Sequence, residues 1–236
     1  MDDANTKEAI ERTATGRADP YANRNSRESR FRANRFKLVQ EIMQSVLREK
    51  GRCTVLDLGG TERYWDIGAD FIRGNEDKLQ ITLLNTDPID VKNSRVFASI
   101  QGSATDKTLL QGQQFDFVHS NSVIEHVGQF ADMKLFADNV RRLAARYYIQ
   151  TPNYWFPYEP HFRFLGFQYL PERLRIEMLH RFALGFFSRQ RDWNDASWLV
   201  RHHRLLSASQ MKSLFPDAEI AFEKVMSFNK SIIAVR

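Results

Sequence analysis

The sequence of 236 residues contains little cysteine and no long apolar run. Cys53 is the only cysteine, which excludes a disulfide within the chain and a metal centre built on cysteines. No apolar stretch approaches the roughly 20 residues that a membrane-spanning helix needs. The first eleven residues also lack the basic start and apolar stretch of a signal peptide. These absences favour a cytoplasmic protein.

Charge is distributed unevenly along the chain. The formal net charge is +5, yet segment 141–212 alone carries twelve Arg and Lys against five Asp and Glu. An excess of basic residues in one segment indicates an anionic partner. A solvated arginine-rich surface explains the same excess equally well, so both interpretations stay open.

Short apolar segments alternate with segments of helical periodicity. The periodicity predicts helices over 29–50, 130–143 and 207–214, and a partly helical segment over 172–187. Strands are predicted over 54–58, 79–85, 96–100, 115–120, 147–150, 218–222 and 232–235. Strands that alternate with helices are typical of parallel sheets. The sequence therefore predicts the α/β class, with a Rossmann-like, seven-stranded, mostly parallel sheet and flanking helices.

The alternation breaks after the fifth strand. Eight aromatic residues lie between Tyr154 and Tyr169, and arginines are frequent as far as Arg204. We therefore predict four regions: a flexible arm over 1–28, a ligand-binding core over 29–152, a lid inserted over 153–204, and a C-terminal helix with strands over 205–236 that complete the core sheet.

The clearest motif is VLDLGGT, Val55–Thr61. A buried strand there delivers an acid and two glycines to the carboxyl edge of the predicted sheet, which is the ligand crevice of doubly wound folds. Glycines let the backbone approach a ligand closely. Asp57 is expected to fix the loop and to attract the cationic end of a ligand, such as an amino group or a sulfonium.

A second polar position stands at the tip of the second predicted strand. Asn85 lies 28 residues after Asp57 and is followed by Asp87. Nucleoside-binding sheets hold ribose hydroxyls at this place. The glycine-rich phosphate motifs are missing, which argues against a nicotinamide-dependent oxidoreductase. A nucleoside ligand that carries an amino acid and no phosphate describes S-adenosylmethionine (SAM).

In this order the motifs resemble those of class I SAM-dependent methyltransferases over roughly residues 50–151. VLDLGG is similar to the glycine loop of that family, LLNTDP to its ribose-binding tip and GSATD to its adenine-contacting turn. FDFVHSNSVIEHV is similar to its fourth strand with the following loop, and RYYIQTPN to its fifth strand. The resemblance implies a SAM-dependent transferase whose cofactor contacts Asp57, Leu58, Gly59, Gly60, Thr61, Asn85, Thr86, Asp87, Ser103, Ala104, Asn121 and Ser122.

Three residues depart from the family pattern. Thr61 replaces a glycine of the loop, Asn85 replaces the usual acid, and Ser103 stands where an Asp often contacts adenine. These departures keep open the alternative of a SAM-binding partner subunit with a degraded catalytic site.

Methyl transfer from a sulfonium requires mainly orientation and a dry site. A hydroxyl acceptor also needs a base. We predict His161 as this base, Glu159 as its orienter or substitute, and His126 as a third candidate, while a packing role for His161 among phenylalanines stays open. No Cys/His group has the spacing of metal ligands, so no metal is expected. His202 and His203 are predicted on the outer face of the lid.

The predicted acceptor is a small molecule or a glycan, methylated at oxygen or nitrogen. It is expected to be anionic, because aromatic faces suit a sugar or planar group and arginines suit phosphate or carboxylate. A nucleic-acid methyltransferase is disfavoured: base-methylating members carry Asn/Asp-Pro-Pro-aromatic where this chain has Asn121-Ser122-Val123-Ile124. Two short apolar pieces beside arginines allow at most transient contact with an anionic membrane.

Overall fold

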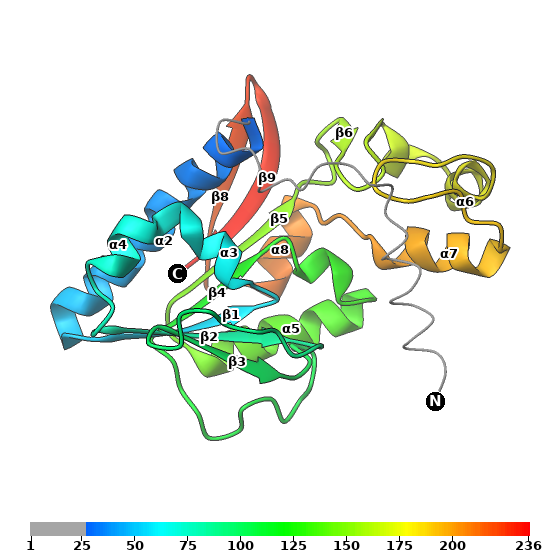
Figure 1. The fold of residues 1–236 in the computed structure, drawn as a ribbon. Helices are drawn as coiled ribbons and strands as arrows, with labels where there is room; N and C mark the ends of the chain where they lie inside the picture. Colours follow the sequence, from blue (N-terminus) through cyan, green and yellow to red (C-terminus); the bar gives the residue numbers. More distant parts are fainter. Residues whose placement is uncertain (1–26) are drawn as a thin grey trace.

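A seven-stranded sheet forms the centre of the molecule, with strand order β3-β2-β1-β4-β5-β9-β8 (Figure 1). The computed structural model describes residues 27–236. The first five strands of this order, β3, β2, β1, β4 and β5, are parallel to one another, and β9 runs antiparallel to both β5 and β8. This confirms the predicted fold class. The predicted arm over 1–28 lies outside the described residues, except for its last two, which begin the first described helix.

The strands of the sheet are β1 Cys53–Leu58, β2 Leu79–Asn85, β3 Phe97–Gln101, β4 Phe117–Asn121, β5 Tyr147–Pro152, β8 Glu219–Val225 and β9 Phe228–Val235. The helices of the core are α2 Arg27–Lys50, α3 Glu62–Trp65, α4 Ala69–Arg73, α5 Phe130–Leu143 and α8 Ala208–Leu214, with short 3₁₀ turns η1 Asp66–Gly68 and η2 Ile124–His126. Strand β2 and helix α5 have the predicted bounds, and Ser207 caps α8 as expected, by accepting a hydrogen bond from Gln210 N.

Helices cover both faces of the sheet (Figure 1). On one face, α2 packs its buried residues Val39, Met43 and Val46 against β1 and β4. On the other face, Met133, Phe136 and Val140 of α5 pack with α8. Burial of these two apolar surfaces is the main force that holds the layers together. Among the described residues, no helix is long and apolar enough to cross a membrane.

Residues 153–204 form a separate lobe beside the carboxyl end of the sheet (Figure 1). It contains the hairpin β6 Tyr158–Glu159 and β7 Phe164–Leu165, the turn η3 Phe167–Tyr169, and helices α6 Glu172–Arg181 and α7 Trp193–His202. Helix α7 is not predicted from the sequence, and α6 ends six residues before the predicted end. Phe162, Phe167, Leu179 and Leu199 build a small core of the lobe's own.

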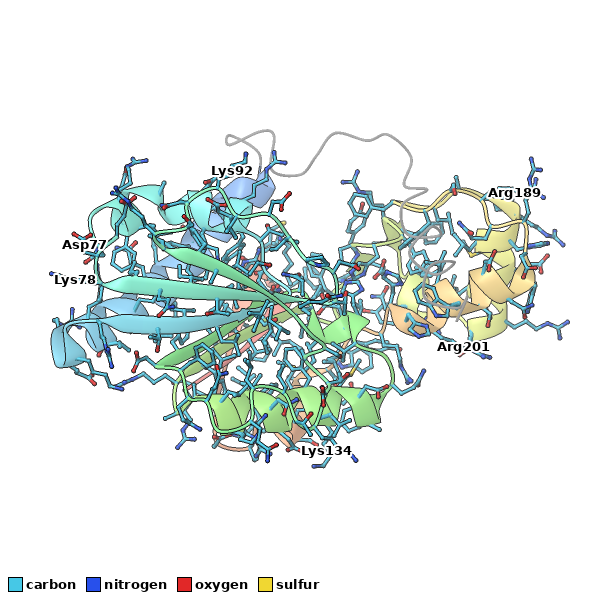
Figure 2. The ribbon with its side chains drawn as sticks, turned by 60° about the horizontal axis from the view of Figure 1, so that its bottom comes forward. Asp77, Lys78, Lys92, Lys134, Arg189 and Arg201 are labelled. Atoms are coloured by element: carbon cyan, nitrogen blue, oxygen red, sulfur yellow. The ribbon has the colours of Figure 1, made fainter. Side chains whose placement is uncertain are left out.

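The lobe leaves the core and returns to it at one narrow place. Asn153 and Leu206 form an isolated parallel bridge, and Tyr154 N donates to Leu206 O at 2.9 Å. Figure 2 shows Arg189 and Arg201 on this lobe, at the opposite end of the molecule from Asp77 and Lys78.

Candidate active site

The loop after β1 is built from two glycines that leave no room for a side chain. Gly59 has a φ of +73°, and a Cβ there would lie 2.6 Å from the side chain of Val123. A Cβ on Gly60 would lie 1.6 Å from the carboxylate of Asp57. Left-handed backbone and close approach both favour glycine. The loop therefore brings bare backbone to the carboxyl edge of the sheet, where doubly wound folds bind ligands.

Asp57 lies beneath this loop, where other residues of the protein hold its carboxylate. The residue has no exposed surface. One carboxylate oxygen accepts a hydrogen bond from Trp65 Nε1 at 2.8 Å, and the other lies 2.7 Å from His119 Nδ1. Asp57 supports the loop from below, and both of its carboxylate oxygens already have partners within the protein. The side chain of Leu58 is buried in the core as well.

Sequence reasoning assigns no role to Trp65, His119 and Tyr64, which complete this support. His119 Nε2 lies 3.1 Å from the Tyr64 hydroxyl, so both ring nitrogens of this buried histidine have partners. A histidine that directly follows two apolar residues in a predicted buried strand is a usable signal, because a buried polar group needs a hydrogen-bond partner. The sequence does not state which acid supplies it.

The tips of β2 and β3 lie next to the glycine loop. Asn85 Nδ2 donates to Gly60 O at 2.9 Å, and this bond does not use the carboxamide oxygen. Thr86 and Asp87 follow on the exposed surface. The Ser103 hydroxyl is bonded within its own turn to Thr105, and Ala104 O accepts from Asn139 Nδ2 at 2.8 Å. Of the residues predicted at these two tips, Asn85 therefore contacts the loop directly.

The tip of β4 carries a polar atom without a partner. Asn121 Oδ1 is buried and has no hydrogen bond within the described part of the chain. Because β1 and β4 pair with Asp57 opposite His119, the register places Asn121 level with Gly59. Ser122 has a φ of 57°, and its hydroxyl donates to Gln150 Oε1 at 2.9 Å. A buried acceptor without a donor is costly unless a ligand supplies one.

The three predicted catalytic residues meet just beyond this tip. His161 Nδ1 lies 2.7 Å from Glu159 Oε1, and His161 Nε2 lies 3.1 Å from His126 Nε2. The second oxygen of Glu159 accepts from Phe162 N at 2.6 Å. Glu159 is buried and holds the His161 ring in one orientation. This is the arrangement expected of an orienting carboxylate and a histidine.

Glu125 and His203 join this cluster without having been predicted. Glu125 has no exposed surface and accepts from the Thr151 hydroxyl at 2.9 Å. The His203 ring centroid lies 4.8 Å from that of His126 and 5.1 Å from that of His161. The prediction that His203 lies on the outer face of the lid is therefore wrong: the chain turns inward after α7, and the residue is buried.

Burial and neighbouring charges separate the pKa values of these groups. Burial lowers the pKa of His203 to about 3, and burial together with the charge of His161 lowers the pKa of His126. For His161, burial also acts downward, but the hydrogen bond and charge of Glu159 outweigh it and leave the pKa raised. Burial raises the pKa of Glu125 to about 7. His161 is thus the most basic histidine of the cluster.

A cavity of about 820 Å³ lies between the lobe and the core. His203 is part of its wall, so the cavity adjoins the histidine cluster. Three arginines and one acid line it, together with aromatic and polar residues: Arg175, Arg201, Arg204, Glu172, Tyr154, Trp155, Gln168, Gln129 and Ser207. Arg175 Nε is buried and has no hydrogen-bond partner in the described structure. The cavity is therefore positively charged.

No protein-family model matches the chain. Uncharacterized proteins from two strains of Mycobacterium tuberculosis are 27% identical to it over 127 residues, and the match covers 46% of this chain and 43% of theirs. The match thus spans less than half the length of these curated relatives.

Solved structures match nearly the whole chain. DszA carbon methyltransferase superimposes with a TM-score of 0.53 at 12% identity, covering 92% of this chain and 56% of that one. The N-methyltransferase NodS from Bradyrhizobium japonicum WM9, in complex with S-adenosyl-L-homocysteine, gives 0.51 at 10% identity, covering 98% and 97%. The chain has the class I methyltransferase fold.

In this methyltransferase fold most of the predicted site residues separate into four groups. Gly59, Gly60, Asn85 and Asn121 meet at the carboxyl edge of the sheet. His126, Glu159 and His161 meet between this edge and the lobe. Asp57 and Leu58 lie below the edge in the core, while Thr61, Thr86, Asp87 and Ser103 lie on its outer rim.

Proposed function

We propose that the chain is a SAM-dependent methyltransferase. The observation that carries this proposal is the crevice above β1 and β4, where the Gly59–Gly60 backbone stands beside a buried Asn121 Oδ1 without a donor. An ammonium group in the crevice would satisfy this oxygen, and a phosphate would not. The class I methyltransferase fold supports the same ligand.

The residues at the crevice fit SAM in two further respects. Asn85 uses its amide nitrogen to hold Gly60 O, and its oxygen can accept from a ribose hydroxyl. Asn139 Nδ2 donates to the backbone carbonyl of Ala104 and so fixes this turn, which keeps the β3 side of the crevice in place for the adenine. When bound, SAM supplies an electrophilic methyl group on a sulfonium.

The chain's own residues would orient the acceptor and remove its proton. We propose His161 as the base, because Glu159 holds the ring and raises its pKa. The proton would leave the acceptor for His161 Nε2, with His126 as the neighbouring ring. The three groups lie between the crevice and the cavity, where an acceptor that enters from the lobe would approach the cofactor.

Residues 153–204 are proposed to bind the acceptor as a lid on the core of 29–152 and 205–236. The cavity under this lobe adjoins His203, and its lining has three arginines against one acid. Tyr154 and Trp155 add aromatic faces. A small-molecule or glycan acceptor that carries a phosphate or carboxylate matches this lining.

Calorimetry with SAM and S-adenosylhomocysteine tests the cofactor proposal. We expect both ligands to bind with one site per chain. Asn85→Ala should weaken binding several-fold, because a hydrogen bond contributes about 1 kcal/mol, whereas Asp87→Ala on the exposed rim should change it less. Absence of binding heat with folded protein refutes the proposal, and a reversed ranking of the two variants moves the ribose contact to Asp87.

A further inference from the structure

Glu125 presents a buried carboxylate oxygen that the protein leaves without a partner. Oε2 accepts from the Thr151 hydroxyl, while Oε1 has no hydrogen bond in the part of the chain that the structure describes. The residue is fully buried. Buried polar atoms are usually satisfied, and a bound ion is one way to satisfy a buried carboxylate oxygen that faces two imidazoles. Oε1 lies 3.9 Å from His126 Nε2.

Two imidazole nitrogens complete a set of three facing groups. His126 Nε2 and His161 Nε2 lie 3.1 Å apart, and the ligand atoms of Glu125, His126 and His161 all lie within 4.8 Å of one another. Two nitrogens at about 2.0–2.1 Å from one tetrahedral zinc ion would be separated by roughly 3.3 Å. The histidine pair is therefore already at ligand spacing, and binding would draw the carboxylate slightly inward.

Glu159 prepares His161 for this role. It occupies Nδ1 of the ring at 2.7 Å, and its other oxygen is fixed by Phe162 N. In the neutral ring this leaves the lone pair on Nε2, which faces His126. A carboxylate behind a ligating histidine, setting its tautomer and orientation, is the usual outer partner in metal sites.

We propose that Glu125, His126 and His161 bind a divalent transition-metal ion of the zinc type. Two imidazoles and one carboxylate are donors that suit zinc and its neighbours, whereas magnesium and calcium prefer oxygen ligands alone. Three protein ligands leave a coordination position open for water or for an acceptor oxygen, as in catalytic rather than structural sites. The side chain of His126 is 34% exposed, so an ion can reach the site.

The structure thereby removes the reason for expecting no metal. That expectation rested on spacing along the chain, but Glu125 and His126 come from η2 and His161 from the lobe, 35 residues from His126. A bound ion would tie the lobe to the core. It would also use the Nε2 lone pair that the general-base role of His161 requires, so the two roles exclude each other.

The test uses tag-free full-length protein stripped with a chelator and then titrated with Zn²⁺ or Co²⁺. We expect one equivalent of Zn²⁺ to bind with sub-micromolar affinity by calorimetry, and Co²⁺ to give the strong visible absorption of a four-coordinate site. Mg²⁺ at millimolar concentration should not displace either ion. No stoichiometric binding by the wild type overturns the proposal without requiring any variant.

Variants locate the site. His161→Asn and Glu125→Gln should each weaken Zn²⁺ binding at least tenfold, and Glu159→Gln should weaken it about 10- to 100-fold through loss of the outer partner. His180→Asn is the matched control, since His180 lies on α6 and bonds to Gln190 O instead. Folding is checked by circular dichroism. Unchanged affinity in His161→Asn and Glu125→Gln overturns the assignment.

Any catalytic role of the ion rests on the proposed function. The metal site and the methyltransferase activity can nevertheless be refuted independently of each other. Zn²⁺ binding and SAM binding are measured independently on the same protein. SAM binding without Zn²⁺ binding removes only the metal site, and Zn²⁺ binding without SAM binding removes only the methyltransferase proposal. Where both bind, loss of methyl transfer on chelation and its return with Zn²⁺ assign His161 as ligand, whereas full activity of metal-free protein assigns it as base and rejects a catalytic ion.

Discussion

The carboxylate of Asp57 joins the glycine loop to the core through two buried contacts, to Trp65 and His119. Asp57→Ala would leave both nitrogen donors buried without an acceptor, at a cost of about 1–3 kcal/mol each. We therefore expect the free energy of unfolding to fall by at least ~2 kcal/mol in urea denaturation. Asp66→Ala, at an exposed position nearby, should change it by less than about 0.5 kcal/mol.

A direct contact between Asp57 and the cofactor would give a different result. If Asp57 touched the cofactor, Asp57→Ala would reduce affinity for SAM while unfolding stayed at the wild-type midpoint. Such a result would contradict the structural role.

For single residues, the sequence predicts the position of a polar side chain better than its hydrogen-bond partners. Asn85 and Asn121 lie at the tips of strands, as expected, because a strand that ends in a polar residue at a parallel-sheet edge leaves that residue at the crevice. Asp57 belongs to the same pattern but is turned under the loop. Its partners come from α3 and from a strand 62 residues away, and no local pattern specifies them.

At the scale of secondary-structure elements, Asp116, which directly precedes β4, connects β1 with the end of α2. Its carboxylate accepts from Thr54 N of β1 at 2.8 Å and from Lys50 Nζ at the end of α2 at 2.6 Å. Burial alone would raise the pKa of Asp116, but the hydrogen bonds from Lys50 and Thr54 outweigh it and leave the pKa lowered. Its contribution to stability is therefore present above the unfolded pKa of about 3.9 and is lost as the pH falls through the folded value.

Asp116→Asn tests this linkage. At pH 7 the variant should be less stable than the wild type by about 1 kcal/mol, since charge-assisted hydrogen bonds become neutral ones. The difference should shrink as the pH is lowered through 4 toward 3, where the wild-type carboxylate is itself protonated. Denaturant midpoints at several pH values measure it, with exposed Asp77→Asn as control. A difference independent of pH would contradict the linkage.

The elements that the sequence predicts are those with a repeating apolar pattern. Apolar residues alternate along β2 and recur at helical spacing along α5, because one face of each element is buried along its whole length. Helix α7 and the β6–β7 hairpin escape prediction for the opposite reason: they pack in a small lobe around Phe162 and Phe167, where aromatic side chains from loops supply much of the core. The β6 and β7 strands have two residues each and α7 has ten, so none of them offers a long apolar pattern.

At the scale of the whole molecule, the arginine-rich lobe lies beside the sheet and not over it (Figure 1). The core carries the crevice, and the lobe carries eight arginines, two of which, Arg189 and Arg201, are labelled in Figure 2. The sequence locates this insertion through its change in composition. It does not predict that the chain after α7 folds inward, which places His203 between the lobe's cavity and the rings of His126 and His161.

Arg175 offers the sharpest test of what this cavity holds. Its guanidinium lines the cavity, burial lowers its pKa, and its Nε has no partner within the described residues, so an anionic group would supply what is missing. Arg173 lies two residues earlier on the same helix, is exposed and does not line the cavity. The two arginines therefore form a matched pair of variants on α6.

We expect Arg175→Gln to raise the KM of an anionic acceptor at least tenfold, because a hydrogen bond to a charged group contributes about 1.5–3 kcal/mol. It should also flatten the dependence of KM on salt, since one charge pair is lost. Arg173→Gln should leave both within twofold, and neither variant should alter the affinity for SAM. The acceptor is found first by screening a compound library for release of S-adenosylhomocysteine. If Arg175→Gln behaves like Arg173→Gln in acceptor kinetics and salt dependence, the cavity does not bind the anionic group, and the basic lobe is a solvated surface.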